Sequence, residues 1–279
     1  MLDFQLFRVG VHPSEQRALF QRDRSPAEVL KDAVCSLPSA ELRRGSIWHV
    51  GNVKSIDEAG LYFRVGRTSK ATVEVYQDGN FIDEEFEAAP YTHVILETRL
   101  EICAIARKAK LSPRTTGIAS QFMRLLNSVR LPGGTIGTFE ISEIKDPEDF
   151  IVHLHKAEFI SKFWTTFSKP NPFDADEDFF KPVQRFLVES NGDKGKAEIE
   201  GTRLRPERLV ELARSAAATG NDAGATLYYP ETEQKVRKRL KGNIVELSQE
   251  DLADDEQRKG FLQRIREIYS RIRGITREE

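Results

Sequence analysis

Five cationic side chains lie within a seven-residue stretch near the C-terminal end of the sequence: Lys235, Arg237, Lys238, Arg239 and Lys241. Such a cluster neutralises phosphates and releases their counterions, which gives affinity for a nucleic-acid backbone of any sequence. Tyr228 and Tyr229 directly precede the cluster, and their rings offer a surface on which bases can stack. The stretch is therefore predicted to contact the phosphates of DNA or RNA.

An acidic region follows the cluster and leaves a second interpretation open. Its carboxylates are Glu246, Glu250, Asp251, Asp254, Asp255 and Glu256. Further cations lie among and beyond them: Arg258, Lys259, Arg264, Arg266, Arg271 and Arg273. If the acids form internal ion pairs with these cations, the region is only a solvated, charged surface.

An apolar stripe marks the end of the chain. Phe261, Ile265, Ile268 and Ile272 are spaced by 4, 3 and 4 residues, which places them along one side of a helix. Ser248 with Asp251 resembles the N-terminal cap of that helix. The stripe is expected to hold a protein partner or a second copy of the chain, or else to dock on its own domain.

Three alternating aspartates, Asp174, Asp176 and Asp178, have the spacing of the first ligands of a calcium-binding loop. The remainder of that loop is missing. Phe179 occupies the position that needs glycine, and Arg185 occupies the position of the bidentate glutamate. The acids are better explained as the cap and first turn of a helix, and we expect no metal site there.

Catalytic patterns are incomplete. Glu143-Ile144-Lys145 has the Glu-x-Lys triplet of one class of metal-dependent nucleases, and Glu97-Thr98-Arg99 is close to it. In such enzymes carboxylates bind Mg²⁺, and the metal stabilises the charge of the phosphate that is cleaved. Because short triplets arise by chance, a nuclease whose acids converge from distant positions remains an alternative, with Mg²⁺ as its cofactor. The main interpretation requires no enzyme chemistry, no cofactor and no metal.

The overall composition limits the class of protein. The apolar share of 39% and the charged share of 31% are typical of a folded chain, and 279 residues suffice for two domains. A net charge of −2 argues against a surface that is basic throughout. Cys35 and Cys103 are far apart and fit a reducing compartment. We expect a cytoplasmic protein without a membrane partner.

The first half of the sequence predicts a mostly antiparallel β-meander with flanking helices, over residues 1–131. Leu61 to Val65 and Val73 to Val75 alternate as separate strands, and Asp78-Gly79 is typical of a hairpin turn. Helices are predicted to begin at Ser25-Pro26 and at Ser112-Pro113. Pro132-Gly133-Gly134 is the predicted linker.

The second half predicts a ferredoxin-like α+β domain over residues 136–247. Its strands are expected at 136–141, 159–167, 196–201 and 225–229, with helices after Pro147 and from Arg205 to Thr219. A further helix, from Asp174 to Glu189, is inserted between the two middle strands. Residues 248–279 form a terminal amphipathic helix in this prediction.

One segment carries a resemblance. His93 to Leu126 reads HVILETRLEICAIARKAKLSP followed by an amphipathic helix, and it resembles segments of uncharacterised bacterial proteins of phage-defence and mobile islands. It contains no catalytic motif, so the resemblance implies a biological context and no residue roles. The sequence as a whole predicts a non-enzymatic nucleic-acid-binding or assembly subunit, with a nuclease and a protein-interaction module as alternatives.

Overall fold

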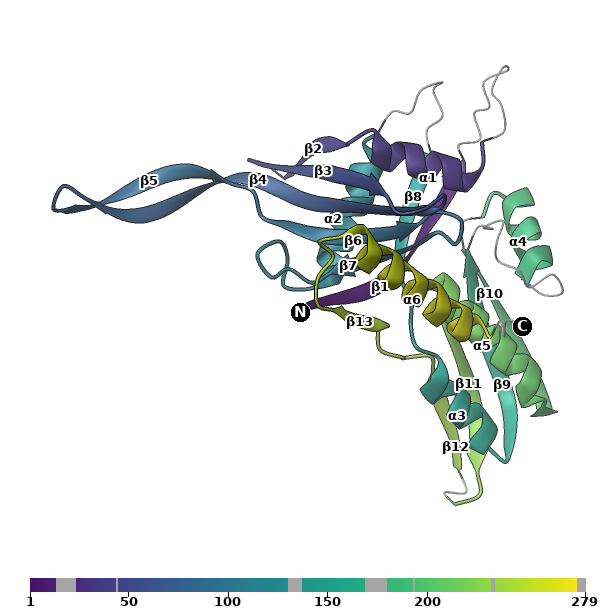
Figure 1. Cartoon of the computed structure of the whole chain (residues 1–279). Helices are drawn as coiled ribbons and strands as arrows, with labels where there is room; N and C mark the ends of the chain where they lie inside the picture. The colour runs from purple at the N-terminus through teal and green to yellow at the C-terminus, as the bar shows by residue number, and fades with distance from the viewer. Residues whose placement is uncertain are drawn as a thin grey trace. The chain divides into compact units, whose positions relative to one another are not determined.

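The computed structural model describes residues 1–13, 24–43, 45–129, 137–168, 180–192, 194–231 and 234–274. Helices and antiparallel strands are mixed along the chain (Figure 1), which confirms the α+β class. Several sequence-based predictions lie outside the described residues: the linker at Pro132-Gly133-Gly134 and the aspartates Asp174, Asp176 and Asp178.

The chain divides into two compact units, and each is built from three stretches of sequence. The first unit contains Met1–Gln5, Val9–Ile141 and Leu247–Leu262, and the second contains Leu6–Arg8, Ser142–Glu246 and Gln263–Glu279.

The expected β-meander is present in the first unit. β2 (Ser39–Arg43), β3 (Ser46–Ser55), β4 (Gly60–Gln77), β6 (Tyr91–Glu97) and β7 (Ile102–Ala106) pair antiparallel in that order. Of the described strands, four more join this sheet: β1 (Leu2–Pro13) beside β7, β5 (Asn80–Ala88) beside β4, and β8 (Gly137–Glu143) and β13 (Glu246–Gln249) beside β1.

Two helices complete the core of the first unit. α1 (Pro26–Cys35) begins with a capping box, in which the Glu28 backbone N–H donates to Ser25 Oγ and the Ser25 N–H donates to Glu28 Oε2. α2 (Thr115–Asn127) packs Phe122 against Phe63 of β4, with ring centroids 5.4 Å apart. Both rings are fully buried, so their removal from water contributes to the stability of this unit.

The structure corrects the prediction of two separate strands at Leu61–Val65 and Val73–Val75, because both belong to β4. The predicted turn is present: Asp78 and Gly79 have φ of 50° and 82°, and they connect β4 to β5 with Gln77 opposite Asn80. Positive φ at both central residues matches the right-handed twist of the strands that the turn joins.

The second unit contains a separate antiparallel sheet with four described strands, in the order β10-β9-β11-β12. Their bounds are β9 (Phe159–Ser168), β10 (Lys194–Leu204), β11 (Ala223–Tyr229) and β12 (Gln234–Arg239). α3 (Glu148–Lys156) and α5 (Pro206–Thr219) pack on each other, and both contact β11 (Figure 1). α4 (Phe180–Glu189) contacts β9.

This sheet differs from the ferredoxin-like plan in the strands that form it. The segment predicted as its first strand lies in β8, which pairs with β1 in the larger sheet. The place of a fourth strand in the smaller sheet is taken by β12, which was not among the predicted strands. Asn127 at the end of α2 explains part of this outcome. Its Nδ2 donates to the Phe139 carbonyl (2.9 Å), and its Oδ1 accepts from the Phe139 N–H (2.8 Å), so the main chain of β8 is held in the first unit.

The last helix, α6, spans Asp255–Arg273, so it begins later than the predicted cap at Ser248. Ser248 lies in β13, where its Oγ donates to Asp3 Oδ1 (2.8 Å). Asp254 caps the helix instead, since its Oδ1 accepts from the Gln257 backbone N–H (2.7 Å). No helix among the described residues is both long and apolar enough to cross a membrane.

Candidate nucleic-acid interface

The sheet of the second unit has two chemically different faces. On one face Ile160, Phe163 and Leu227 are at most 1% exposed, beneath α3 and α5. The register of the strands assigns a second set of side chains to the opposite face. These side chains are all at least partly exposed: Phe159, Lys162, Trp164, Thr226, Tyr228, Lys196, Glu198, Lys235, Arg237 and Arg239. We refer to this second face as the open face.

Trp164 lies at the centre of the open face, on β9. It pairs with Glu198 of β10 on one side and with Gly224 of β11 on the other. A Cβ placed on Gly224 would come within 2.6 Å of the indole Nε1 and 2.7 Å of two ring carbons. The indole therefore lies across the neighbouring strand in the space that only a glycine leaves free.

Two cations approach the ring of Trp164. Lys196 Nζ is 5.1 Å from the centre of the ring, and Arg239 Cζ is 5.8 Å from it. Both distances are within the range in which a cation is attracted to an aromatic face. Lys196 comes from β10 and Arg239 from β12, so strands at both edges of the sheet supply a cation to one indole.

A second aromatic group lies further along the same face. The rings of Phe159 and Tyr228 are stacked, with centroids 4.6 Å apart and planes inclined by 13°. Tyr228 is four positions after Gly224 on β11, about 13 Å at the usual rise of a strand. The open face thus offers two apolar ring surfaces, separated along the strands and bordered by cations.

The basic cluster predicted from the sequence forms β12 and the residues after it. Lys235, Arg237 and Arg239 alternate as exposed residues and pair with Tyr228, Thr226 and Gly224 of β11. Lys238 points to the opposite face with Val236, and Lys241 is exposed beyond the strand. Within the described part of the chain, none of these five cations forms an ion pair with a carboxylate.

The two predicted stacking tyrosines are on different faces. Tyr228 stacks on Phe159 at the open face. The Tyr229 hydroxyl lies 3.0 Å from Nδ1 of His153 on α3, and burial raises the pKa of Tyr229. Tyr229 therefore helps to join β11 to α3 and is not part of the open face.

The β10 edge of the open face carries carboxylates. Glu198 accepts from Lys162 Nζ (2.8 Å) and from Lys196 Nζ (2.9 Å), and Glu200 also pairs with Lys162. Hydrogen bonds from Lys162 and then Lys196 lower the pKa of Glu198 to about 2. Hydrogen bonds to Glu198 and Glu200 raise the pKa of Lys162. The charges of Lys162, Lys196, Glu198 and Glu200 balance one another, whereas the cations of β12 have no such carboxylate partners among the described residues.

The predicted partner stripe on α6 is mostly buried within the chain. Phe261, Ile265 and Ile272 are 1%, 0% and 3% exposed, and only Ile268 is partly exposed. The Phe261 ring packs against Phe4, with centroids 4.7 Å apart. A partner could reach these side chains only if α6 moved, so the stripe is not included in the candidate interface.

The residues of the nuclease alternative have structural partners. Lys145 Nζ lies 2.8 Å from Asp222 Oδ1, and Glu97 is 2% exposed, with its Oε1 accepting from the Arg99 N–H (3.1 Å). Across the described ranges, no three His, Cys, Asp or Glu side chains are grouped to hold a metal ion. Burial raises the pKa of the Cys103 thiol, which is fully enclosed.

The chain matches no protein-family model and no curated protein.

Proposed function

We propose that this protein binds single-stranded nucleic acid on the open face of the second unit, as a binding subunit without catalytic chemistry. The observation that carries the proposal is the position of Trp164, whose indole lies across Gly224 with Lys196 and Arg239 near the ring. A partly exposed ring beside cations can stack a base while the cations contact the flanking phosphates.

The arrangement favours single strands because stacking on a side chain requires an unpaired base. Bases inside a duplex are stacked on each other, so Trp164 and the pair Phe159–Tyr228 have no free base surface to contact. The described strands present alternating ring and cation side chains on this face. We infer that binding tolerates any base sequence, since every base has a face that can stack.

The proposal includes a cellular setting. The resemblance of His93 to Leu126 to proteins of phage-defence islands supports a bacterial, cytoplasmic protein that holds single strands within a larger assembly. DNA and RNA both present unpaired bases and phosphates, so binding measurements on the two are part of the test.

The direct experiment measures affinity for labelled oligonucleotides over a series of salt concentrations, with and without Mg²⁺. The variant Lys235→Gln/Arg237→Gln/Arg239→Gln removes three cations of the open face. Each phosphate contact with a single strand contributes about −0.7 to the slope of log affinity against log salt concentration. Loss of three contacts should therefore reduce the magnitude of this slope by about 2. The affinity for an unstructured single strand should fall at least tenfold.

Lys238→Gln is the matched control, because Lys238 is on the same strand and points to the other face. It should leave both the affinity and the slope almost unchanged. Equal losses from the control and the triple variant would contradict the proposal, since general charge would then explain binding. Mg²⁺-dependent cleavage of the oligonucleotide would instead support the nuclease alternative.

A further inference from the structure

A long β-arm extends from the sheet of the first unit (Figure 1). It is formed by residues 70–77 of β4 and 80–88 of β5, which pair residue by residue from Lys70 opposite Glu87 to Gln77 opposite Asn80. Large apolar side chains are exposed along it: Val73 (41%), Tyr76 (67%), Phe81 (84%), Ile82 (43%) and Phe86 (47%). A two-stranded ribbon with this much exposed apolar surface is marginally stable in water unless something packs on it.

One edge of the arm is open to a further strand. The ladder between β3 and β4 ends where Ser46 pairs with Ser69, and β5 is the only described strand that pairs with β4 beyond that point. The two-residue turn makes Gln77 and Asn80 a hydrogen-bonded pair, and the pattern alternates along the strands. Thr72, Glu74 and Tyr76 therefore direct their backbone N–H and C=O groups toward the open edge.

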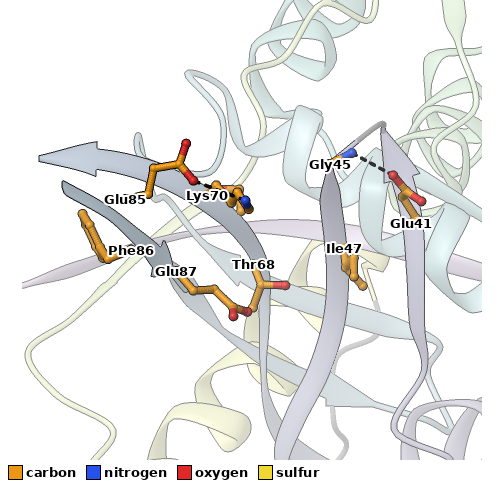
Figure 2. A pocket seen from close by; sticks show the side chains of 9 residues that line it. Glu41, Gly45, Ile47, Thr68, Lys70, Glu85, Phe86 and Glu87 are labelled. Carbon is orange, nitrogen blue, oxygen red and sulfur yellow. Dashed lines mark hydrogen bonds and ion pairs between the residues drawn. The ribbon is translucent and has the colours of Figure 1, made fainter. Parts of the chain in front are cut away.

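A concavity of about 480 Å³ lies where this edge begins (Figure 2). Ile47 supplies apolar surface, and Glu41, Glu85 and Glu87 supply carboxylates, whereas the register places the Phe86 side chain on the other face of the arm. Figure 2 shows Glu41 held by the Gly45 N–H (2.7 Å) and Lys70 Nζ beside Glu85 (3.2 Å). Acidic groups around an apolar lining suit a side chain with an aliphatic stem and a cationic end, as in lysine and arginine.

The charge of the arm selects the kind of strand that can bind. Lys70 is the only cation between residues 70 and 88, whereas the acids are Glu74, Asp78, Asp83, Glu84, Glu85 and Glu87. Pairing this edge with the arm of a second copy would bring like charges together, which disfavours self-association by this route. A cationic segment would meet complementary charge on the same surface.

We propose that the open edge of β4 binds an extended, lysine- or arginine-rich segment of a partner protein as an added strand. The backbone groups of Thr72, Glu74 and Tyr76 pair with the segment, and one of its cationic side chains enters the concavity between Ile47 and Glu87. Strand addition of this kind takes affinity from main-chain hydrogen bonds and specificity from pockets for alternate side chains. This surface is separate in sequence from the open face, and its function does not depend on nucleic-acid binding.

The test uses a fluorescein-labelled peptide of alternating lysine and valine and the full-length protein, with binding followed by fluorescence anisotropy. A peptide of alternating glutamate and valine is the charge control. The lysine peptide with N-methylated backbone nitrogens keeps its charge but cannot pair with a strand edge. The lysine peptide should bind at least tenfold more tightly than either control.

Two variants locate the binding site. Glu85→Lys/Glu87→Lys reverses the charge beside the concavity, and Thr72→Pro removes one N–H from the open edge without removing a bond within the arm. Each should weaken peptide binding at least tenfold, while circular dichroism and the thermal midpoint remain close to those of the parent protein. Trp164→Leu should leave peptide binding unchanged.

Three results would overturn the proposal. The first is equal binding of the N-methylated peptide, which would reduce the interaction to charge alone. The second is full binding by both arm variants. The third is a concentration-dependent dimer in sedimentation that Thr72→Pro abolishes, because a second copy would then occupy the edge.

Discussion

The indole of Trp164 lies against the backbone of Gly224, so closely that a Cβ on Gly224 would be 2.6 Å from the indole nitrogen. The contact joins two neighbouring strands and places the ring over Gly224, with Lys196 and Arg239 near it. Because Gly224 has no side chain, the indole of Trp164 can lie over its backbone and form a surface for stacking.

Gly224→Ala should displace this ring. The added methyl group overlaps the indole, and such overpacking typically costs about 1–3 kcal/mol of folding free energy. We expect a lower thermal midpoint, a changed near-ultraviolet circular dichroism spectrum and weaker binding of a single-stranded oligonucleotide. Thr226→Ala is the matched control, because Thr226 lies two residues further along β11 on the same face. It should change the affinity little. Wild-type binding by a stably folded Gly224→Ala protein would show that the position of Trp164 over Gly224 is not required.

Glu198→Gln should increase affinity for nucleic acid. Glu198 holds both Lys162 and Lys196 on the open face, and removal of its charge would free Lys196 for a phosphate and leave Lys162 paired only with Glu200. The salt dependence of binding should become steeper at the same time, because more counterions are released. Glu211→Gln on α5 is a charge-matched control outside the open face, and it should have a much smaller effect. An affinity that falls in Glu198→Gln would mean that the lysines need the carboxylate for their positions.

The same carboxyl group should make stability depend on pH in acid. Its pKa is lowered from 4.5 to about 2 by Lys162 and Lys196, so the folded state holds the proton less tightly than the unfolded chain. Its ion pairs therefore stabilise the protein fully above about pH 4.5 and lose that contribution as the pH falls toward 2. The thermal midpoint of the wild type should exceed that of Glu198→Gln at pH 7, and the difference should shrink steadily as the pH falls from about 4.5 toward 2. A constant difference over this range would contradict the assignment.

The stripe on α6 should behave as core. Phe261 is 1% exposed and packs on Phe4, so Phe261→Ala should lower the free energy of unfolding by about 3–5 kcal/mol. Ile268→Ala, at the partly exposed position of the stripe, should cost less. Chemical denaturation of both variants provides the measurement. If Phe261→Ala were as stable as the wild type, α6 would not depend on this side chain for its position.

Local patterns in the sequence predicted much of the fold. Ser25-Pro26 begins the expected helix, and Asp78-Gly79 forms the expected turn, because each depends only on neighbouring residues. Which of the two sheets β8 joins was not predictable in the same way. Alternating apolar residues show that a segment is a strand, but its hydrogen bonds to Asn127 are set by a residue from another part of the chain.

The candidate site was predicted only in part. The charge of β12 is visible in the sequence, but the alternation that separates Lys238 from Arg237 and Arg239 requires the strand to be known. Trp164 was missed for a further reason. A β-bulge shifts the register of β9 and β11 between Thr226 and Leu227, so Ile160 and Phe163 share the buried face despite odd spacing. A simple alternation over Phe159 to Phe167 therefore does not reveal which aromatic residues are at the open face.

Trp164 itself can report on the central claim. The protein has two tryptophans, and Trp48 is buried in the first unit, so Trp48→Phe leaves Trp164 as the only indole. Titration of this variant with unstructured oligothymidylate should quench the tryptophan emission in step with binding measured by anisotropy, and added salt should reverse both signals. Trp164→Leu should weaken binding by roughly 1–3 kcal/mol, the usual contribution of one stacked base. Binding with unchanged Trp164 emission would place the nucleic acid elsewhere and contradict the proposal.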